Sequence, residues 1–442
     1  MSGGSKIATG LSWLSDSPAE RWVRGIVDKP KLQLRKSREL FEEAQRLSPG
    51  GVMGIRRPYN FVPGEYPIFI ERGYGGHIID VDGNDYIDML CGYGPIILGY
   101  NEPEINQAVI EQMDKGFCFS LVQPIQNKLE ARLIELLPCA EMAILVKTGS
   151  DATGVAVRIA RGYTDKPKIL RCGYHGWHDW CVEVHGGVPE EVRKLTIEFP
   201  YGDLDALEKA LEENRGEVAG IIITPVGHPL ALPVVAPPEG YLEGVRELAD
   251  RYEAVLIFDE IRTGFRVALG GAQERYGVTP DLTTIGKAMA NGYAISACVG
   301  KAEIMKVAEK KVFISSTFFP NSLEMVAAMK CIDILERDKV IDDIWVRGQR
   351  FLDRLSEIVK DSGVPATVSG IPPMPFITFD KVDNLYKERR ECFYTQTIRR
   401  NLFIQPYHHW YICYRHTDED LEHALNAIGE ALDVVRTRYP IK

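Results

Sequence analysis

The chain has 442 residues, of which 45% are hydrophobic and 26% charged, and its formal net charge at pH 7 is −10. This composition excludes a disordered chain and predicts two or three packed domains. The negative charge argues against nucleic acid or an acidic membrane as the main partner, because both require clustered positive charge.

Cysteine usage and apolar runs indicate where the protein works. The nine cysteines are dispersed without a CxxC pair, which is typical of reduced thiols in a cytosolic enzyme. No window reaches the ~18 consecutive apolar residues of a membrane-spanning helix, and no leader-peptide pattern opens the sequence. We therefore expect a cytoplasmic protein without a membrane partner.

The N-terminal quarter predicts an arm followed by a small sheet. Residues 1–36 mix glycine, serine and basic residues without a period, and we interpret them as an arm. The apolar residues of 37–47 share one helical face. Residues 66–90 alternate apolar runs with Gly-Gly and Asp-Gly turns, which predicts an antiparallel meander. Residues 101–116 predict a helix with Asn101 as its N-cap.

From about residue 140, apolar runs alternate with amphipathic helical segments. The runs are residues 142–147, 166–172, 218–224, 253–259, 282–286 and 296–300. Continuous β-branched runs between helices predict strands buried on both faces, and hence a mostly parallel sheet. Ligands on such sheets bind beyond the carboxyl ends of the strands. From about residue 330 a long helix, two strands and a terminal helix follow.

The turn at Thr148, Gly149 and Ser150 is a candidate anion site. It follows a predicted strand and opens a helix, where free backbone N–H groups and the helix dipole favour negative charge. The alternative is an ordinary N-cap, because threonine and serine cap helices well.

The stretch GYHGWHD, residues 173–179, places an aromatic side chain in a second turn. Tyr174 could stack on a flat heterocycle, or it could simply pack in the turn. His175, His178 and His185 lie close together in sequence, but no carboxylate or cysteine completes a ligand set, so we predict no metal site.

Asp259 and Lys287 end two predicted strands. Charged strand ends often only meet water, but a buried aspartate needs a cationic partner or several donors. A lysine in a partly apolar site has a lowered pKa and forms an imine with a carbonyl. The two turns match a phosphate and a flat ring, and Asp259 and Lys287 match a ring nitrogen and an aldehyde. The molecule that combines these groups is pyridoxal 5′-phosphate.

These residues and their order resemble those of the class III pyridoxal-phosphate-dependent aminotransferases of fold type I. Within that family, the chain is most similar to the glutamate-1-semialdehyde aminomutase branch. The resemblance covers about residues 37–435. Residues 257–292 carry its most specific part, with TGFR, YGVTPDL and GK at the family spacing, and the stretches SPGGVMGIRRP, DVDGNDYIDML and GYGPIILGYNEPEI are also similar.

The resemblance implies the fold class and the domain division. The expected fold is α/β, with a large domain built on a mostly parallel sheet of the seven-stranded type and a small α+β domain from both chain ends. The expected parts are the arm over 1–36, a first piece of the small domain over 37–88, the large cofactor-binding domain over 89–325 and the rest of the small domain over 326–442.

The resemblance also implies roles for single residues. Lys287 would bind the cofactor as an imine and move the substrate proton, and Asp259 would keep the ring nitrogen protonated. The other implied cofactor contacts are Gly149, Ser150, Tyr174, Ile261 and, across a subunit boundary, Thr317. Because Thr317 would reach the phosphate of a neighbouring subunit, we expect a homodimer with shared active sites.

The substrate side of the site resembles the family less closely. The resemblance implies that Arg57 binds a substrate carboxylate, with Arg56 one residue away as the alternative, and that Tyr93 lines the pocket. Thr224 replaces an acid of the family pattern, and His408 falls roughly where the aminomutase has a glutamate. His408 is therefore a candidate substrate-binding residue in a rebuilt pocket.

The loop rich in glycine, serine and proline that the aminomutase places after the Tyr-His-Gly turn is missing. Since a lid retains a reactive intermediate, its loss favours two separate half-reactions. We predict a ping-pong aminotransferase that moves an amino group between a small amino acid or amine and a keto acid or aldehyde. The alternatives are an aminomutase or a racemase or epimerase on the same scaffold. A catalytically silent binding protein is disfavoured, because Lys287 and Asp259 are both present.

Overall fold

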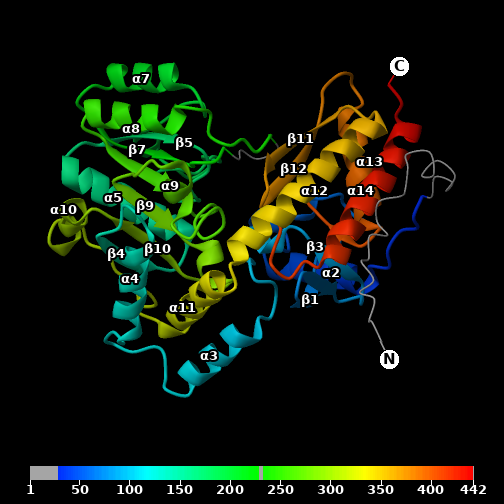
Figure 1. The fold of residues 1–442 in the computed structure, drawn as a ribbon, viewed down its shortest axis with the longest axis horizontal. Helices are drawn as coiled ribbons and strands as arrows, with labels where there is room; N and C mark the ends of the chain where they lie inside the picture. Colours follow the sequence, from blue (N-terminus) through cyan, green and yellow to red (C-terminus); the bar gives the residue numbers. More distant parts are fainter. Residues whose placement is uncertain (1–27, 228–231, 442) are drawn as a thin grey trace, which may run out of the picture.

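The structure is a computed structural model that describes residues 28–227 and 232–441. Most of the predicted N-terminal arm, residues 1–27, lies outside the described residues. Figure 1 shows two halves: a seven-stranded sheet with helices on both faces, and a smaller part in which β1 and β3 from near the N-terminus lie with α13 and α14 from the C-terminal end.

The large sheet has the strand order β4-β10-β9-β8-β7-β5-β6. Its strands are β4 (Met142–Val146), β5 (Lys168–Cys172), β6 (Thr196–Glu198), β7 (Val218–Ile223), β8 (Val255–Asp259), β9 (Leu282–Ile285) and β10 (Ser296–Gly300). All neighbours are parallel except β10, which is antiparallel to both β4 and β9. The predicted α/β fold with a mostly parallel sheet is confirmed. Strand β6 was not predicted, because its three residues form no apolar run.

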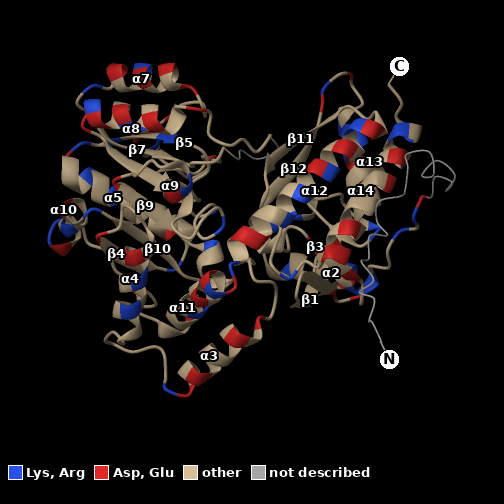
Figure 2. Cartoon of the chain, in the orientation of Figure 1, with Lys and Arg blue, Asp and Glu red and all other residues tan. Residues whose placement is uncertain are grey.

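The strands of this sheet are buried on both faces. Ile222 and Ile257 pack into the core beneath helix α5 (Gly149–Thr164), whereas Ile221 and Phe258, one residue along each strand, pack on the opposite face. That opposite face is covered by α7 (Leu204–Glu213) and α8 (Tyr241–Arg251), whose outer sides carry charges of both signs (Figure 2). Successive side chains of a strand point to opposite faces, so alternate residues enter two apolar layers. Burying each such side chain stabilises the fold by about 1.5–3 kcal/mol.

The smaller part joins the two ends of the chain. Its four-stranded sheet contains β1 (Ile70–Tyr74), β2 (His77–Asp80), β3 (Asp85–Asp88) and β13 (Leu402–Phe403). The first three strands form the predicted antiparallel meander, and β13 adds in parallel to β3, with Leu402 opposite Ile87. The remaining elements of this part are α2 (Arg35–Leu47), the hairpin β11 (Ala366–Ile371) and β12 (Met374–Phe379), α12 (Val340–Ser362), α13 (Tyr386–Ile398) and α14 (Asp418–Arg438).

The other helices are α3 (Pro103–Met113), α4 (Ile125–Leu136), α6 (Glu190–Arg193), α9 (Gly271–Tyr276), α10 (Ala302–Met305) and α11 (Ser322–Arg337). Asn101 is not the N-cap of α3: Glu102 holds that position, and Asn101 is left-handed with φ of 59°. Pro103 explains the shift, because proline favours the first helical position. Helix α11 runs through the expected boundary at residue 325, and the domain division stays a prediction.

Candidate active site

Asp259 and Lys287 lie at the same edge of the large sheet. Strands β8 and β9 are parallel neighbours, with Asp259 opposite Thr284, and Lys287 follows three residues later. Lys287 has a left-handed backbone, with φ of 46°. A non-glycine residue in this region stores strain, and such strain is concentrated at functional sites. The structure therefore places the two predicted residues at neighbouring strand ends.

Asp259 is held as a buried carboxylate by three donors. It is 4% exposed. One oxygen lies 2.7 Å from Nδ1 of His175, and the other accepts from the N–H of Ile261 at 3.1 Å and the hydroxyl of Thr284 at 3.2 Å. Because a carboxylate accepts, Nδ1 of His175 carries the proton. These bonds satisfy the buried charge and fix its direction.

The sequence suggests His175 only as a metal ligand and does not predict its contact with Asp259. The side chain is 2% exposed, its ring stacks on Trp180 with centroids 6.1 Å apart, and Nε2 has no hydrogen-bond partner among the described residues. The hydroxyl of Thr153 donates to the His175 carbonyl at 2.7 Å, which ties this turn to helix α5. The only sequence signal was that His175 follows Tyr174 directly.

Lys287 lies in an electrostatic environment that favours the neutral amine. Burial and then the positive charge of Arg262 hold the pKa of Lys287 well below its usual value, while Asp259 opposes this shift. Arg266 acts in the same direction as Arg262. A neutral amine has the lone pair that attack on an aldehyde requires.

The predicted anion site lies at the start of helix α5, and its role stays a prediction. The side chain of Thr148 caps the helix, and the N–H groups of Gly149 and Ser150 belong to the first turn, where a helix has no carbonyl to offer them. A Cβ on Gly149 would lie 3.1 Å from Cγ2 of Ile261, so glycine allows this close approach. The hydroxyl of Ser150 accepts from the N–H of Trp177 at 3.3 Å, which joins the two predicted turns.

These residues fit pyridoxal 5′-phosphate by their chemistry. Asp259 provides a buried carboxylate for the ring nitrogen, Lys287 an amine of low pKa for the aldehyde, and Gly149 and Ser150 a helix start for the phosphate. Tyr174 is 40% exposed, so its ring is open to a further contact.

Tyr93 and His408 form one wall beside Lys287. Their rings meet edge to face with centroids 5.2 Å apart, and the backbone of Tyr93 is left-handed, with φ of 70°. Nδ1 of His408 donates to the carbonyl of His409 at 2.8 Å, which leaves Nε2 as the acceptor of the ring. Burial, and next the charge of Arg262, hold the pKa of His408 well below its usual value, so the imidazole is neutral.

Arg57 is directed toward its own loop, although the Ile55 carbonyl of that loop accepts from the hydroxyl of Tyr93 at 3.1 Å. Its Nε donates to the carbonyl of Val52 at 3.3 Å, and its guanidinium also contacts the carbonyl of Pro49 at 3.5 Å. Arg56 is the neighbour that approaches the site, with its Cζ 5.4 Å from the centroid of the Tyr93 ring. The substrate role of Arg57 stays a prediction without a contact to support it.

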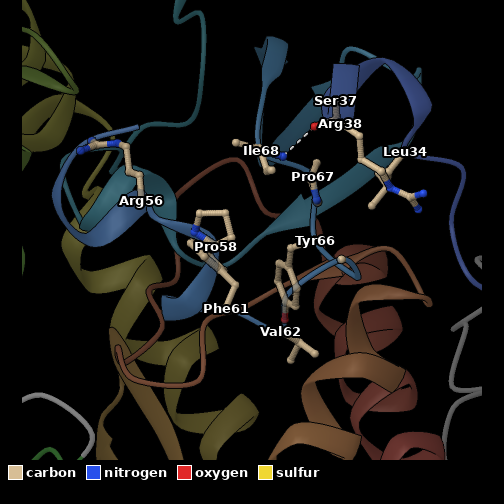
Figure 3. A pocket seen from close by; sticks show the side chains of 11 residues that line it. Leu34, Ser37, Arg38, Arg56, Pro58, Phe61, Val62, Tyr66, Pro67 and Ile68 are labelled. Atoms are coloured by element: carbon tan, nitrogen blue, oxygen red, sulfur yellow. Dashed lines mark hydrogen bonds between the residues drawn. The ribbon is translucent and has the colours of Figure 1, made fainter. Parts of the chain in front are cut away.

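A small cavity between α2 and residues 56–68 is lined mainly by apolar side chains. In Figure 3 the side chain of Arg56 extends away from the wall made by Phe61, Val62 and Tyr66, and the N–H of Ile68 donates to the hydroxyl of Ser37. This packing supports the loop that carries Arg56, and the lining includes no acidic residue, histidine or cysteine.

Thr317 is exposed and lines a hollow on a different surface. Its neighbours there include Phe119 and Val122 and residues of the edge strand β4. Within one chain, this hollow does not include the residues around Lys287.

Cys91, Cys413 and His416 form a buried cluster with ligand atoms within 4.8 Å of one another. Both nitrogens of His416 are engaged by the backbone: Nδ1 accepts from the N–H of Cys413 at 3.1 Å, and Nε2 donates to the carbonyl of Asp88 at 3.1 Å. The cluster is therefore explained by packing and backbone hydrogen bonds.

The fold and the site together define a pyridoxal-phosphate-dependent enzyme of fold type I. The family model described as aminotransferase class-III matches residues 61–432, and the chain belongs to this family.

Relatives and solved structures agree with the family. The chain is 62% identical to a 3-aminobutyryl-CoA aminotransferase of Cloacimonas acidaminovorans over 92% of this chain and 99% of that protein. It is 36% identical to a glutamate-1-semialdehyde 2,1-aminomutase of Methanothrix thermoacetophila, over 92% and 98% of the two chains. The FumI protein of Sphingopyxis sp. MTA144, solved in its pyridoxal-phosphate internal aldimine form, superposes with a TM-score of 0.87 at 28% identity over 92% and 98% of the chains.

These findings confirm the predicted aminotransferase and its cofactor, and they make the aminomutase alternative the weaker one. An amino donor and a keto acceptor are the substrates that this family implies. Within residues 28–227 and 232–441, no helix combines the length and the apolar character that crossing a membrane requires.

Proposed function

We propose that the amino donor is a short β-amino acyl thioester of the 3-aminobutyryl-CoA kind and that the acceptor is a 2-keto acid. The observation that carries this proposal is the 62% identity, over nearly the full length of both chains, to the 3-aminobutyryl-CoA aminotransferase of Cloacimonas acidaminovorans. The donor would become a 3-oxoacyl thioester, and the acceptor would become an amino acid.

The pocket wall supports a donor without a carboxylate. His408 is buried and neutral, and Arg57 is engaged by carbonyls of its own loop. A neutral imidazole beside the ring of Tyr93 suits an uncharged thioester better than a charged carboxylate, because burying an unpaired charge is costly.

The roles of the cofactor residues follow from their surroundings. When bound, pyridoxal phosphate supplies the aldehyde that takes the amino group and the ring that accepts an electron pair. Lys287 would hold the aldehyde carbon and, once released, move the proton from the carbon that bears the amine. Asp259, oriented by His175, would hold the proton on the ring nitrogen, while Ile261 and Tyr174 would contact the two faces of the ring.

The proposed reaction is ping-pong, with the keto product leaving before the acceptor binds. We further propose a cytoplasmic homodimer in which Thr317 contacts the phosphate of the neighbouring site. The exposed apolar side chains near Thr317 support such an interface: Phe117, Phe119, Leu121, Val122 and Phe318. Exposed patches of this kind mark protein–protein contacts.

The test compares 3-aminobutyryl-CoA with free 3-aminobutyrate as donors for the purified enzyme, with 2-oxoglutarate or pyruvate as acceptor. Without an acceptor we expect at most one equivalent of the 3-oxoacyl thioester per active site, and continued formation only when an acceptor is supplied; the free acid should react far more slowly. Equal use of the free acid would refute the thioester assignment. Isomerisation of a single substrate without a keto acid would favour the mutase or racemase alternative.

A further inference from the structure

Arg262 is a buried arginine in the turn that follows strand β8. The N–H of Gly264 donates to the carbonyl of Glu260 at 2.8 Å, and the hydroxyl of Thr263 donates to the carboxylate of Glu260 at 3.0 Å. These bonds fix the turn around Arg262, which is 8% exposed. Its guanidinium is thus held inside the protein.

The guanidinium lies among the residues of the site. Its Cζ is 5.7 Å from the centroid of the Tyr174 ring. Its charge also acts, after burial, to lower the pKa of Lys287 and of His408. Arg262 is therefore close both to the cofactor lysine and to the substrate wall.

Two other arginines, Arg266 and Arg57, donate to backbone carbonyls. Arg266 is fully buried, donates to the carbonyls of Gly94 at 2.7 Å and Ile412 at 3.3 Å, and lies over the ring of Tyr411. Arg57 contacts its own loop. The charge of Arg262 acts on both Lys287 and His408.

We propose that Arg262 is the specificity residue for the amino acceptor and that its guanidinium binds the carboxylate of a 2-keto acid. A guanidinium presents paired N–H donors in one plane, which match a carboxylate. The positive field that Arg262 and Arg266 create around Lys287 favours an anionic substrate. This proposal rests on the proposed function in one respect: the carboxylate belongs to the acceptor and not to the donor.

The experiment isolates the acceptor half-reaction. Apoenzyme is loaded with pyridoxamine 5′-phosphate, so no donor is needed, and the return of the aldehyde form is followed by its absorbance after mixing with pyruvate or with acetaldehyde, which lacks the carboxylate. In Arg262→Met we expect kcat/KM for pyruvate to fall by about 10- to 150-fold, the range for lost charge-assisted hydrogen bonds. The value for acetaldehyde should fall clearly less, because the effect of Arg262 on the pKa of Lys287 is common to both acceptors whereas the carboxylate contact is not, so the pyruvate-to-acetaldehyde ratio should fall.

Two further variants sharpen the test. Arg262→Lys keeps the charge but not the planar pair of donors, so it should lie between wild type and Arg262→Met with pyruvate. Arg215→Met removes an exposed arginine that pairs with Glu212 on the surface, and it should behave as wild type with both acceptors.

An equal loss with pyruvate and acetaldehyde in Arg262→Met would overturn the proposal, because the residue would then act on the cofactor or on the fold. If Arg262→Met does not fold, an unchanged pyruvate-to-acetaldehyde ratio in Arg262→Lys would overturn it instead. Since no acyl thioester is used, failure of 3-aminobutyryl-CoA as a donor would not affect this result.

Discussion

Individual residues determine the charge state of the site. Asp259 is buried and contacts three hydrogen-bond donors, whereas burial and the charge of Arg262 lower the pKa of Lys287 and favour its neutral amine. The carboxyl group of Asp259 can thus bind a positively charged partner, and the amine of Lys287 can attack a carbonyl. These properties come from the neighbours of the two residues and not from the residue types.

His175 is expected to act as a positioning residue for Asp259. Replacing it with phenylalanine removes a hydrogen bond to a charged group, worth about 1.5–3 kcal/mol, and should lower kcat/KM by about 10- to 150-fold. His175→Asn can still donate and should recover part of the loss. The second readout is retention of pyridoxal phosphate on dialysis, which should fall in His175→Phe.

The matched control is His178→Phe, which changes a histidine three residues away that has no contact with Asp259 among the hydrogen bonds of the described residues. It should keep both activity and cofactor. If His175→Asn is as impaired as His175→Phe, the hydrogen bond is not the reason for the loss.

At the scale of elements, a histidine joins the small sheet to the last helix. His77 in β2 contacts Asp85 in β3 at 2.9 Å and Asp420 in the first turn of α14 at 3.0 Å. The hydrogen bond with Asp420 is the largest cause that raises the pKa of His77 from 6.5 to about 9. Burial opposes the shift at Asp420, but the bond from His77 brings the pKa of this carboxyl down from 3.8 to about 2.

This contact predicts a pH-dependent stability. Because the pKa of His77 is raised on folding, its contribution is complete below about pH 6.5 and is lost as the pH rises through 9. The contribution of Asp420 is present above pH 3.8 and is lost as the pH falls toward 2. Because these side chains are partly exposed, we expect the contact to contribute about 1–2 kcal/mol to the free energy of unfolding at pH 6.

The measurement is the melting temperature of His77→Gln and wild type at pH 6 and pH 10. The variant should melt about 2–4 °C lower at pH 6, and the difference should shrink at pH 10. His185→Gln, at an exposed position, serves as the control and should not differ from wild type. A difference that is the same at both pH values would show that the charge of His77 does not contribute.

At the scale of the whole molecule, the proposed shared site predicts complementation between two inactive variants. Lys287→Ala should lack transfer activity, because the amine proposed to hold the cofactor and move the proton is removed, and Thr317→Asp should repel the phosphate. In a hybrid dimer, one site would carry both changes and the other neither. Co-expressed chains carrying two different tags should therefore regain up to about half of the wild-type activity per hybrid dimer.

If Thr317 acts within its own chain, each site of the hybrid carries one change and no activity returns. Light scattering of the wild-type protein provides the parallel check: a mass of one chain at full activity would refute the dimer. Leu121→Asp, which places a charge on a side chain that is 81% exposed, should weaken the dimer if this surface is the interface.

The sequence alone determined much of the fold and predicted the candidate cofactor residues that follow strands. Period and composition predicted six of the strands in the large sheet, because apolar runs between amphipathic helices have few other solutions. Asp259 and Lys287 stood out for a related reason: a charged residue directly after a buried run must lie at a strand end, where parallel sheets place their ligands.

Only the tertiary structure decided which side chains meet. His175 lies 84 positions from Asp259, Tyr93 and His408 are even further apart in sequence, and no local pattern encodes such contacts. The same holds for the arginines: Arg57 and Arg262 look alike in the sequence, but one turns back on its own loop and the other is buried beside Tyr174. A short-range pattern specifies a strand end, whereas side-chain direction depends on the packing of distant segments, and that packing makes this pocket.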